Sequence, residues 1–267
     1  MTQEERRLFL IRALLCERPD GDRLQIPADT QGQKDLLRAL MNVRQPLPLD
    51  AQYLEIERAY LQQEIAAKGV TTLDRLTPLD GELYLWQGDI TTLECDAIVN
   101  AANSALLGCF QPLHNCIDNC IHTFAGLALR NACDVLMQKQ GYAEPTGQAK
   151  ITPGFNLPCK YVLHTVGPIV SGKLTDEHCR LLASCYRSCL SLAEAHGCES
   201  IAFCCISTGV FGFPQQEAAE IAVRTVKAYK EKTYSKIKVI FNVFKDEDDR
   251  LYRHILTEHR SAQTRAF

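Results

Sequence analysis

Apolar residues recur at helical spacing through the first part of the chain. The segment 4–18 places apolar side chains three or four positions apart, and the segments 31–45 and 50–69 repeat this spacing. Such a period is typical of helices that bury one face. The intervening stretches contain prolines, and Gly69 ends the third segment, as expected where helices stop. The pattern therefore predicts three helices within residues 1–80.

A different pattern begins near residue 83, where short apolar runs alternate with longer amphipathic segments. Strands that alternate with helices are typical of an α/β domain with a parallel or mixed sheet. Residues 71–83 resemble a linker, so we expect a helical extension over 1–80 and an α/β domain over 81–267. The predicted strands are 83–88, 96–102, 148–154, 161–167, 200–207 and 236–244. The predicted helices are 117–139, 176–197, 214–232 and 247–260.

Composition narrows the class of protein. The 267 residues are 46% hydrophobic and carry a formal net charge of −3, which suits a globular protein of this size. No excess of basic residues favours a nucleic-acid partner, and no apolar run is long enough for a membrane span. Thirteen cysteines without a secretory signal sequence predict a cytoplasmic protein with reduced thiols. Most are expected to be small core residues, such as Cys204 and Cys205 in an apolar strand.

Three loops that leave predicted strands carry candidate chemistry. Asp89, in QGDIT, can accept a hydrogen bond from the amine of a nucleobase, or it can simply cap the next turn. The loop STGVFGFP, 207–214, leads from a strand into a helix, and such turns can hold a phosphate with backbone N–H groups. Asn100 and Asn103, in VNAAN, can close a turn, and Asn103 can instead hold a sugar hydroxyl or a water.

The last of these loops runs into a cluster of three cysteines and two histidines between residues 109 and 122. Their spacing is Cys-x4-His-x-Cys-x3-Cys-x-His. Zinc prefers thiolate and imidazole ligands, and a catalytic zinc keeps one coordination position open. The cluster therefore predicts a metal site, with a thiol nucleophile or ordinary packing as the alternatives.

Several motifs occur in a recognisable order. GDIT, VNAAN, an ID that starts a helix containing IH, TVGP and STGVFGFP together resemble the macrodomain family of ADP-ribose-binding modules. The resemblance covers residues 83–260 and implies a three-layer α/β/α macrodomain with a mixed sheet, preceded by an N-terminal helical extension. The first eighty residues are similar to the extension of one bacterial subgroup, the zinc-containing macrodomains, which are protein-ADP-ribose hydrolases.

By this resemblance, residues of several motifs line one ADP-ribose site. Asp89 and the backbone of the next residue read adenine, and Phe244 stacks on it, as an aromatic face does on a purine. The loop 207–211 surrounds the pyrophosphate. Asn103 and Asp118 lie at the distal ribose as catalytic residues. The resemblance assigns ADP-ribose binding to Asp89, Ile90, Asn103, Cys116, Ile117, Asp118, Ser207, Thr208, Gly209, Val210, Phe211 and Phe244.

One stretch departs from the family pattern. Where most macrodomains have a run of glycines before the aspartate, this chain has GCFQPLHNC. Its Cys-x4-His-x-Cys resembles the ligand set of the zinc-containing subgroup, which implies that Cys109, His114 and Cys116 bind one Zn²⁺ per chain. Cys120 and His122 are then expected to pack the helix, and His122 matches a family histidine that binds no metal. A structural zinc would instead need one of these two as a fourth ligand.

The resemblance implies a zinc-dependent, glycosidase-type hydrolase that removes mono-ADP-ribose from a protein side chain, with an Asp or Glu carboxylate as the expected linkage. It also implies a lipoyl carrier protein, modified by a sirtuin-like ADP-ribosyltransferase, as the protein substrate. Asp118 would orient or deprotonate the attacking water, while zinc would activate that water or position the ribose. Two alternatives stay open: a non-catalytic reader of ADP-ribose, and a hydrolase of a small derivative such as O-acetyl-ADP-ribose.

Overall fold

The computed structural model describes residues 1–264 and the side chains of residues 1–257. Residues 265–267, the last three of the predicted α/β domain, lie outside this range. The helices are α1 (Gln3–Cys16), α2 (Thr30–Val43), α3 (Ala51–Lys68), α4 (Ile117–Ala125), α5 (Leu127–Gln140), α6 (Asp176–Ala195), α7 (Gln215–Thr233) and α8 (Asp246–Thr264). The strands are β1 (Thr71–Thr72), β2 (Pro78–Asp80), β3 (Leu83–Gln87), β4 (Leu93–Glu94), β5 (Ala97–Ala102), β6 (Ala149–Pro153), β7 (Tyr161–Val166), β8 (Ser200–Phe203) and β9 (Lys238–Val243).

Seven strands form one mixed sheet in the order β2-β3-β9-β8-β5-β7-β6. The five inner strands are parallel, and the edge strands β2 and β6 run antiparallel to their neighbours. The inner strands β8 and β9 are almost wholly buried, as expected for parallel strands that helices cover on both faces. β1 and β4 form a separate, short parallel pair.

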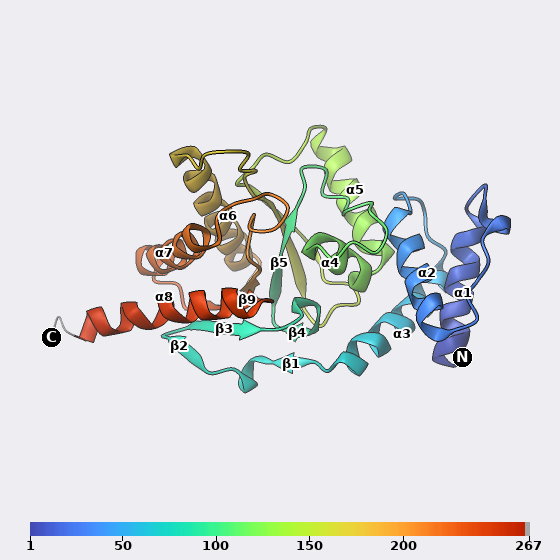
Figure 1. The fold of residues 1–267 in the computed structure, drawn as a ribbon, viewed down its shortest axis with the longest axis horizontal. Helices are drawn as coiled ribbons and strands as arrows, with labels where there is room; N and C mark the ends of the chain where they lie inside the picture. Colours follow the sequence, from blue (N-terminus) through green and yellow to red (C-terminus); the bar gives the residue numbers. More distant parts are fainter. Residues whose placement is uncertain (265–267) are drawn as a thin grey trace.

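Helices lie on both sides of this sheet (Figure 1). α6, α7 and α8 pack on one face, and α4 and α5 pack on the other. The main core lies between these layers and includes Ile98 and Val99 of β5 and Leu182 of α6. The predicted three-layer α/β/α arrangement with a mixed sheet is therefore confirmed.

The three N-terminal helices build a second core outside the α4–α5 layer (Figure 1). Leu10, Leu37 and Tyr60 belong to it, one from each helix. Leu127 of α5 joins this second core, while Ile65 of α3 joins the main core. The predicted helical extension is thus packed directly against the α/β layers.

The region around the predicted domain boundary differs in detail from the sequence prediction. The expected linker, 71–83, contains β1 and β2, and β2 pairs with β3 as an edge strand of the sheet. A boundary after residue 80 stays a prediction, although Pro78–Asp80, directly before it, already belong to the sheet.

One predicted helix is interrupted, and one predicted strand ends earlier than expected. The helix predicted at 117–139 is interrupted at Gly126, which has a φ of 90°. A Cβ at this position would lie 2.5 Å from Glu57 Oε2, so the backbone turns where only glycine fits. The strand predicted at 200–207 ends at Phe203, and Cys204 and Cys205 lie in the loop that follows.

All thirteen cysteines carry free thiols, and seven of them are buried, which agrees with their expected role as small core residues. Within residues 1–264, no helix has the length and apolar character needed to cross a lipid bilayer.

Candidate active site

The predicted site residues gather at one edge of the sheet. Because β3, β9, β8, β5 and β7 are parallel, their carboxyl ends meet at this edge. Open α/β sheets bind ligands at such an edge. The loops that leave it are 88–92, 103–116 and 204–214, together with the turn at Phe244.

Asp118 lies in the first turn of α4 and is only 4% exposed. Asn100, fully buried inside β5, donates from Nδ2 to Asp118 Oδ1 at 2.7 Å. Asn103, just beyond β5, donates to Asp118 Oδ2 at 3.4 Å and to the Gly108 carbonyl at 3.0 Å. Burial raises the pKa of Asp118 to about 6, against the opposing effects of Asn100 and the Arg130 charge. The structure thus brings Asn103 and Asp118 together, as predicted.

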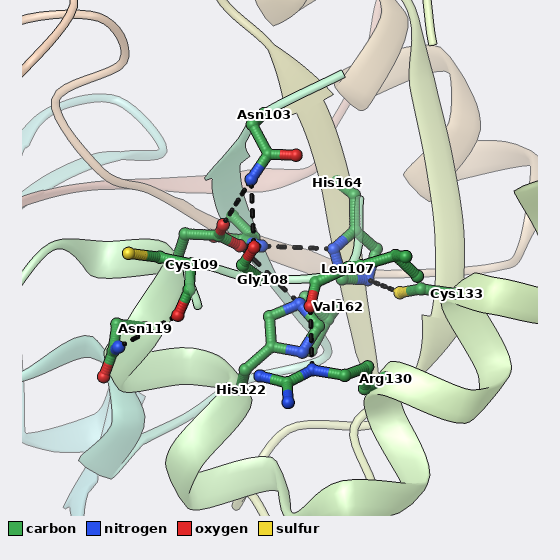
Figure 2. Close-up of polar contacts among 12 residues, drawn as sticks. Asn103, Leu107, Gly108, Cys109, Asn119, His122, Arg130, Cys133, Val162 and His164 are labelled. Atoms are coloured by element: carbon green, nitrogen blue, oxygen red, sulfur yellow. Dashed lines mark hydrogen bonds and ion pairs between the residues drawn. The ribbon is translucent and has the colours of Figure 1, made fainter. Parts of the chain in front are cut away.

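Figure 2 shows two buried histidines, His122 and His164, and the first lies beside the Asp118 carboxylate. His122 Nε2 is 3.6 Å from Asp118 Oδ1, and burial holds the pKa of His122 well below its usual range. Burial lowers the pKa of His164 to about 3, so this ring is also neutral. His164 Nδ1 accepts from Asn100 Nδ2 at 3.2 Å, which leaves Nε2 to donate to Thr152 Oγ1 at 2.9 Å. The neutral ring therefore fixes the amide that holds Asp118.

Cys109, His114 and Cys116 form a separate half-buried group. Their candidate ligand atoms all lie within 4.8 Å of one another, and Cys109 Sγ is 3.5 Å from His114 Nδ1. Figure 2 shows the Cys109 sulfur pointing away from His122 and His164. Two sulfurs and one imidazole at this separation are a donor set that zinc takes, so these residues fit the predicted metal site.

The surroundings of Cys116 do not activate its thiol as a nucleophile. Burial raises the pKa of the Cys116 thiol to about 12, and Cys109 and Asp118 add to the rise. The Asn119 backbone N–H donates to Cys116 Sγ at 3.4 Å, so this cysteine also caps α4. A nucleophilic cysteine needs a lowered pKa, which these neighbours do not provide.

The two remaining members of the sequence cluster stand apart from this group. Cys120 Sγ lies 3.9 Å from Arg38 Nη2. His122 belongs to a second, fully buried group with Cys133 and His164. Within the described residues, the first group therefore offers three protein ligands, as a metal site with an open position would.

Asp89 follows β3 and caps the short 3-10 turn Ile90–Thr92. Its Oδ1 accepts from the Thr91 backbone at 3.0 Å and from the Thr91 hydroxyl at 2.6 Å. Its Oδ2 accepts from Lys68 Nζ at 2.8 Å, at the end of α3. Burial alone would raise the pKa of Asp89, but these hydrogen bonds bring it below its ordinary value. The side chain is therefore an anionic acceptor with a defined orientation.

Phe244 follows β9 next to the Asp89 turn and is 77% exposed. Gln87 Nε2 donates to the Phe244 carbonyl at 3.2 Å, and the Gly88 backbone N–H donates to the Val243 carbonyl at 3.0 Å. These bonds hold the two loops together. An exposed aromatic ring near a carboxylate acceptor suits recognition of a base such as adenine.

The loop after β8 is closed by its own backbone, because Phe213 N donates to the Ser207 carbonyl at 3.0 Å. Ser207 has a φ of 67°. Its side chain fills the space beside Gly167, because a Cβ added to Gly167 would lie 2.0 Å from Ser207 Oγ. Val210 at the tip is exposed, and α7 begins just after the loop at Gln215. Exposed backbone before a helix N-terminus suits a phosphate group. Thr208, Gly209 and Phe211 lie in the same turn.

The sequence prediction missed residues that touch the site from the extension. Lys68, Arg38 and Asn42 reach it because α2 and α3 pack against α4 and the turn after β3. Turn closure, which the sequence offers as a role for Asn100, does not apply, because Asn100 is fully buried within β5. A polar residue inside an otherwise apolar strand was the available signal for this role.

Comparisons with known proteins agree with this arrangement. Residues 99–222 match the family described as Macro domain. The protein-ADP-ribose hydrolase of Treponema medium is 59% identical over 261 residues, which are 96% of this chain and 100% of the relative. The protein of the same name from Staphylococcus aureus strain MSSA476 is 50% identical over 250 residues, 92% of each chain. The solved Trypanosoma brucei macrodomain in complex with ADP-ribose is 30% identical, with a TM-score of 0.63 over 81% of this chain and 94% of that chain.

Proposed function

This chain belongs to the macrodomain family, and from that premise we propose that it is a zinc-dependent hydrolase that removes mono-ADP-ribose from a carboxylate side chain of a modified protein. Relatives at 59% and 50% identity are named protein-ADP-ribose hydrolase, which supports hydrolysis of ADP-ribose. The observation that carries the proposal is that the buried carboxylate of Asp118 lies in the first turn of α4, the helix capped by Cys116, one of three metal-type ligands. A base with a shifted pKa next to such a group favours chemistry over binding alone.

ADP-ribose would lie along the carboxyl edge of the sheet. Its adenine would bind between Asp89 and the exposed ring of Phe244. Its pyrophosphate would lie over the loop 207–211, in front of α7. Its distal ribose would then reach Asn103 and Asp118, where the reaction takes place.

Cys109, His114 and Cys116 would hold the zinc ion. When bound, zinc supplies a Lewis acid that withdraws charge from oxygen atoms at the distal ribose. Cys116 also caps α4, and Asp118 lies in the first turn of that helix. The same helix start therefore carries one ligand and the expected base.

The bond that breaks would join the anomeric carbon of the ribose to the side-chain oxygen of the modified protein. A water molecule adds at this carbon, and the freed carboxylate leaves as an anion that needs no strong acid. Asp118 orients the water and accepts its proton, and Asn100 keeps the carboxylate in place through the 2.7 Å hydrogen bond. Asn103, whose Nδ2 lies 3.4 Å from the same carboxylate, would hold the neighbouring ribose hydroxyl.

For the protein substrate we propose a cytoplasmic lipoyl carrier protein that a sirtuin-like ADP-ribosyltransferase has modified. The likeness of the sequence to the zinc-containing subgroup supports this part. Faster turnover of the modified carrier than of O-acetyl-ADP-ribose is expected. The opposite order would favour a hydrolase of small ADP-ribose derivatives.

The decisive experiment measures release of ADP-ribose from a carboxylate-linked, mono-ADP-ribosylated protein. It compares the protein as purified, the chelator-stripped protein, and the stripped protein with zinc returned. We expect activity to be lost on stripping and restored by zinc. Activity that ignores stripping would contradict the zinc part of the proposal. Tight ADP-ribose binding without release by any form would favour a reader.

A further inference from the structure

Two side chains of α2 hold the backbone around His114. Asn42 Oδ1 accepts from the Leu113 backbone N–H at 3.0 Å, and Arg38 Nη2 donates to the His114 carbonyl at 2.8 Å. The two contacts flank His114 on either side. Both side chains come from the N-terminal extension, and neither belongs to the ligand group itself.

Asn42 is 1% exposed, and the surrounding donors and acceptors fix its orientation. Its Nδ2 donates to Thr123 Oγ1 on α4 at 3.0 Å. The Thr123 hydroxyl donates its own proton to the Asn119 carbonyl at 2.7 Å, so it can only accept from Asn42. The carbonyl oxygen of the Asn42 amide must then face the Leu113 N–H. One buried amide thus joins α2, α4 and the metal-binding loop.

Leu113 needs this support because its φ is 59°. The left-handed region of φ and ψ is unfavourable for residues other than glycine, including leucine. Because the Leu113 side chain is exposed, little packing offsets this backbone strain. The nearby turn is closed only by a long hydrogen bond of 3.3 Å from His114 N to the Gln111 carbonyl. Since His114 follows Leu113 directly, the conformation of Leu113 sets where the imidazole points.

Arg38 extends the support to the other side of the loop. The same Nη2 group, which has two hydrogens, also lies 3.1 Å from Asn115 Oδ1 and 3.2 Å from Asn119 Oδ1, so these acceptors share its hydrogens with the His114 carbonyl. Asn119 in turn donates to the carbonyls of Gln111 at 2.9 Å and Cys109 at 3.2 Å, and the contact with Cys109 is visible in Figure 2. The loop is therefore held from α2 at both its histidine and its first cysteine.

We propose that Asn42 and Arg38 are positioning residues that set the metal affinity of the group Cys109, His114 and Cys116. The N-terminal extension then contributes to metal binding by holding the loop that carries the ligands. This inference rests on the proposed function, which supplies the zinc ion. What it adds is that residues of α2 hold the zinc ligands in place.

The test is the zinc affinity of the full chain, measured by competition with a chromophoric chelator. Asn42→Leu keeps the size of the side chain and removes both hydrogen bonds. We expect its zinc affinity to fall about 10- to 100-fold, as for other residues that orient metal ligands. Arg38→Met changes a half-exposed side chain and should shift affinity in the same direction. If Asn42→Leu does not fold, the zinc affinity of Arg38→Met decides the test.

Asn131→Leu is the matched control. Asn131 Nδ2 donates to the Leu47 carbonyl at 2.8 Å, so this change also removes an asparagine bond between the extension and the rest of the chain. Asn131 lies on α5 and makes no hydrogen bond to the loop 109–116 among the described contacts. Its zinc affinity should stay within about threefold of the wild type. Thermal unfolding of the metal-free proteins reports any damage to the fold separately.

Wild-type zinc affinity in both Asn42→Leu and Arg38→Met would overturn the inference. An equal loss in Asn131→Leu would also overturn it, because any loosening of the interface would then suffice. If the wild-type chain binds no zinc, both the zinc part of the proposed function and this inference are wrong. This outcome differs from unchanged zinc affinity in the two variants, which contradicts the inference alone.

Discussion

A carboxylate such as Asp118 is buried only where its neighbours replace the lost water. Asn100 supplies one hydrogen bond at 2.7 Å, and the neutral ring of His164 accepts the other amide proton. The second oxygen of Asp118 makes only a long contact of 3.4 Å with Asn103. That oxygen is therefore the one available to a water molecule.

Asp118→Asn should abolish catalysis without removing the ligands. The amide keeps the shape of the side chain but cannot accept a proton from water, so the rate should fall by at least about 100-fold. Zinc content and ADP-ribose affinity should stay close to the wild type. The assay is release of ADP-ribose from the modified protein, with calorimetric ADP-ribose binding as the control. Release at the wild-type rate would rule Asp118 out as the base.

Cys116→Ser should separate the two tasks of Cys116. The hydroxyl can still accept from Asn119 and cap α4, but it is a poor zinc ligand. We expect loss of bound zinc and of activity, with ADP-ribose binding at the adenine end retained. Metal content by atomic emission checks the first point. Cys120→Ala is the control and should keep its zinc, and a full zinc complement in Cys116→Ser would contradict the ligand assignment.

Single residues could be predicted from the sequence where a motif fixes their surroundings. Asp89, Asp118 and Asn103 lie at the ends of strands or at the start of a helix, as expected. Lys68 and Asn42 could not be predicted. Each lies in a helix of the extension, and only the tertiary packing brings it to the site.

At the scale of elements, the joint between α3 and α5 depends on a buried acid. Glu57 of α3 accepts from the Leu127 backbone N–H at 3.1 Å, at the start of α5. The break at Gly126 makes room for this carboxylate. Burial raises the pKa of Glu57 to about 7, so the folded chain holds a proton there that the unfolded chain releases near pH 4.5.

Glu57→Gln should change the dependence of stability on pH. Between pH 5 and 7 the folded wild type binds one proton more than the unfolded chain, so its stability falls as the pH rises. The variant cannot titrate, and it should gain up to about 3 kcal/mol relative to the wild type by pH 8, at about 1.4 kcal/mol per unit of pKa.

Urea unfolding from pH 5 to pH 8, with chelator in every sample, measures this difference. Glu55→Gln changes an exposed acid on the same helix, and its stability should stay within about 0.5 kcal/mol of the wild type. A constant difference for Glu57→Gln would show that Glu57 does not carry a raised pKa in the folded chain.

Most elements could be predicted from their apolar period, but their ends depended on tertiary contacts. The break at Gly126 is imposed by Glu57, which lies far away in the sequence. β2 was missed because a three-residue edge strand has too few positions to show an alternating pattern.

At the scale of the whole molecule, ligand binding to the folded state alone should stabilise the fold. Zinc at about 100 times its dissociation constant should add about 2.7 kcal/mol to the stripped protein. A rise in melting temperature on adding zinc to wild type, and none for Cys109→Ser, is the expected result. Equal shifts for both would place the metal somewhere other than the group of Cys109, His114 and Cys116.

The layered architecture followed from the alternation of strands and helices, whereas the order of the strands did not. Neighbours such as β3 and β9 are separated by most of the chain, and their pairing depends on contacts that no local pattern records. The second core could not be predicted from local patterns either, because it includes Leu127 of the α/β layers.

The contact between Asn42 and Leu113 spans 71 positions of the sequence, and it makes the metal-binding loop hard to transplant. Copying residues 109–116 into a macrodomain without α2 would transfer three ligands but leave the left-handed Leu113 without its partner. A designer would have to graft the helix together with the loop. In a lineage, the two segments would be inherited as one unit, because a change in either would alter the fit of the other.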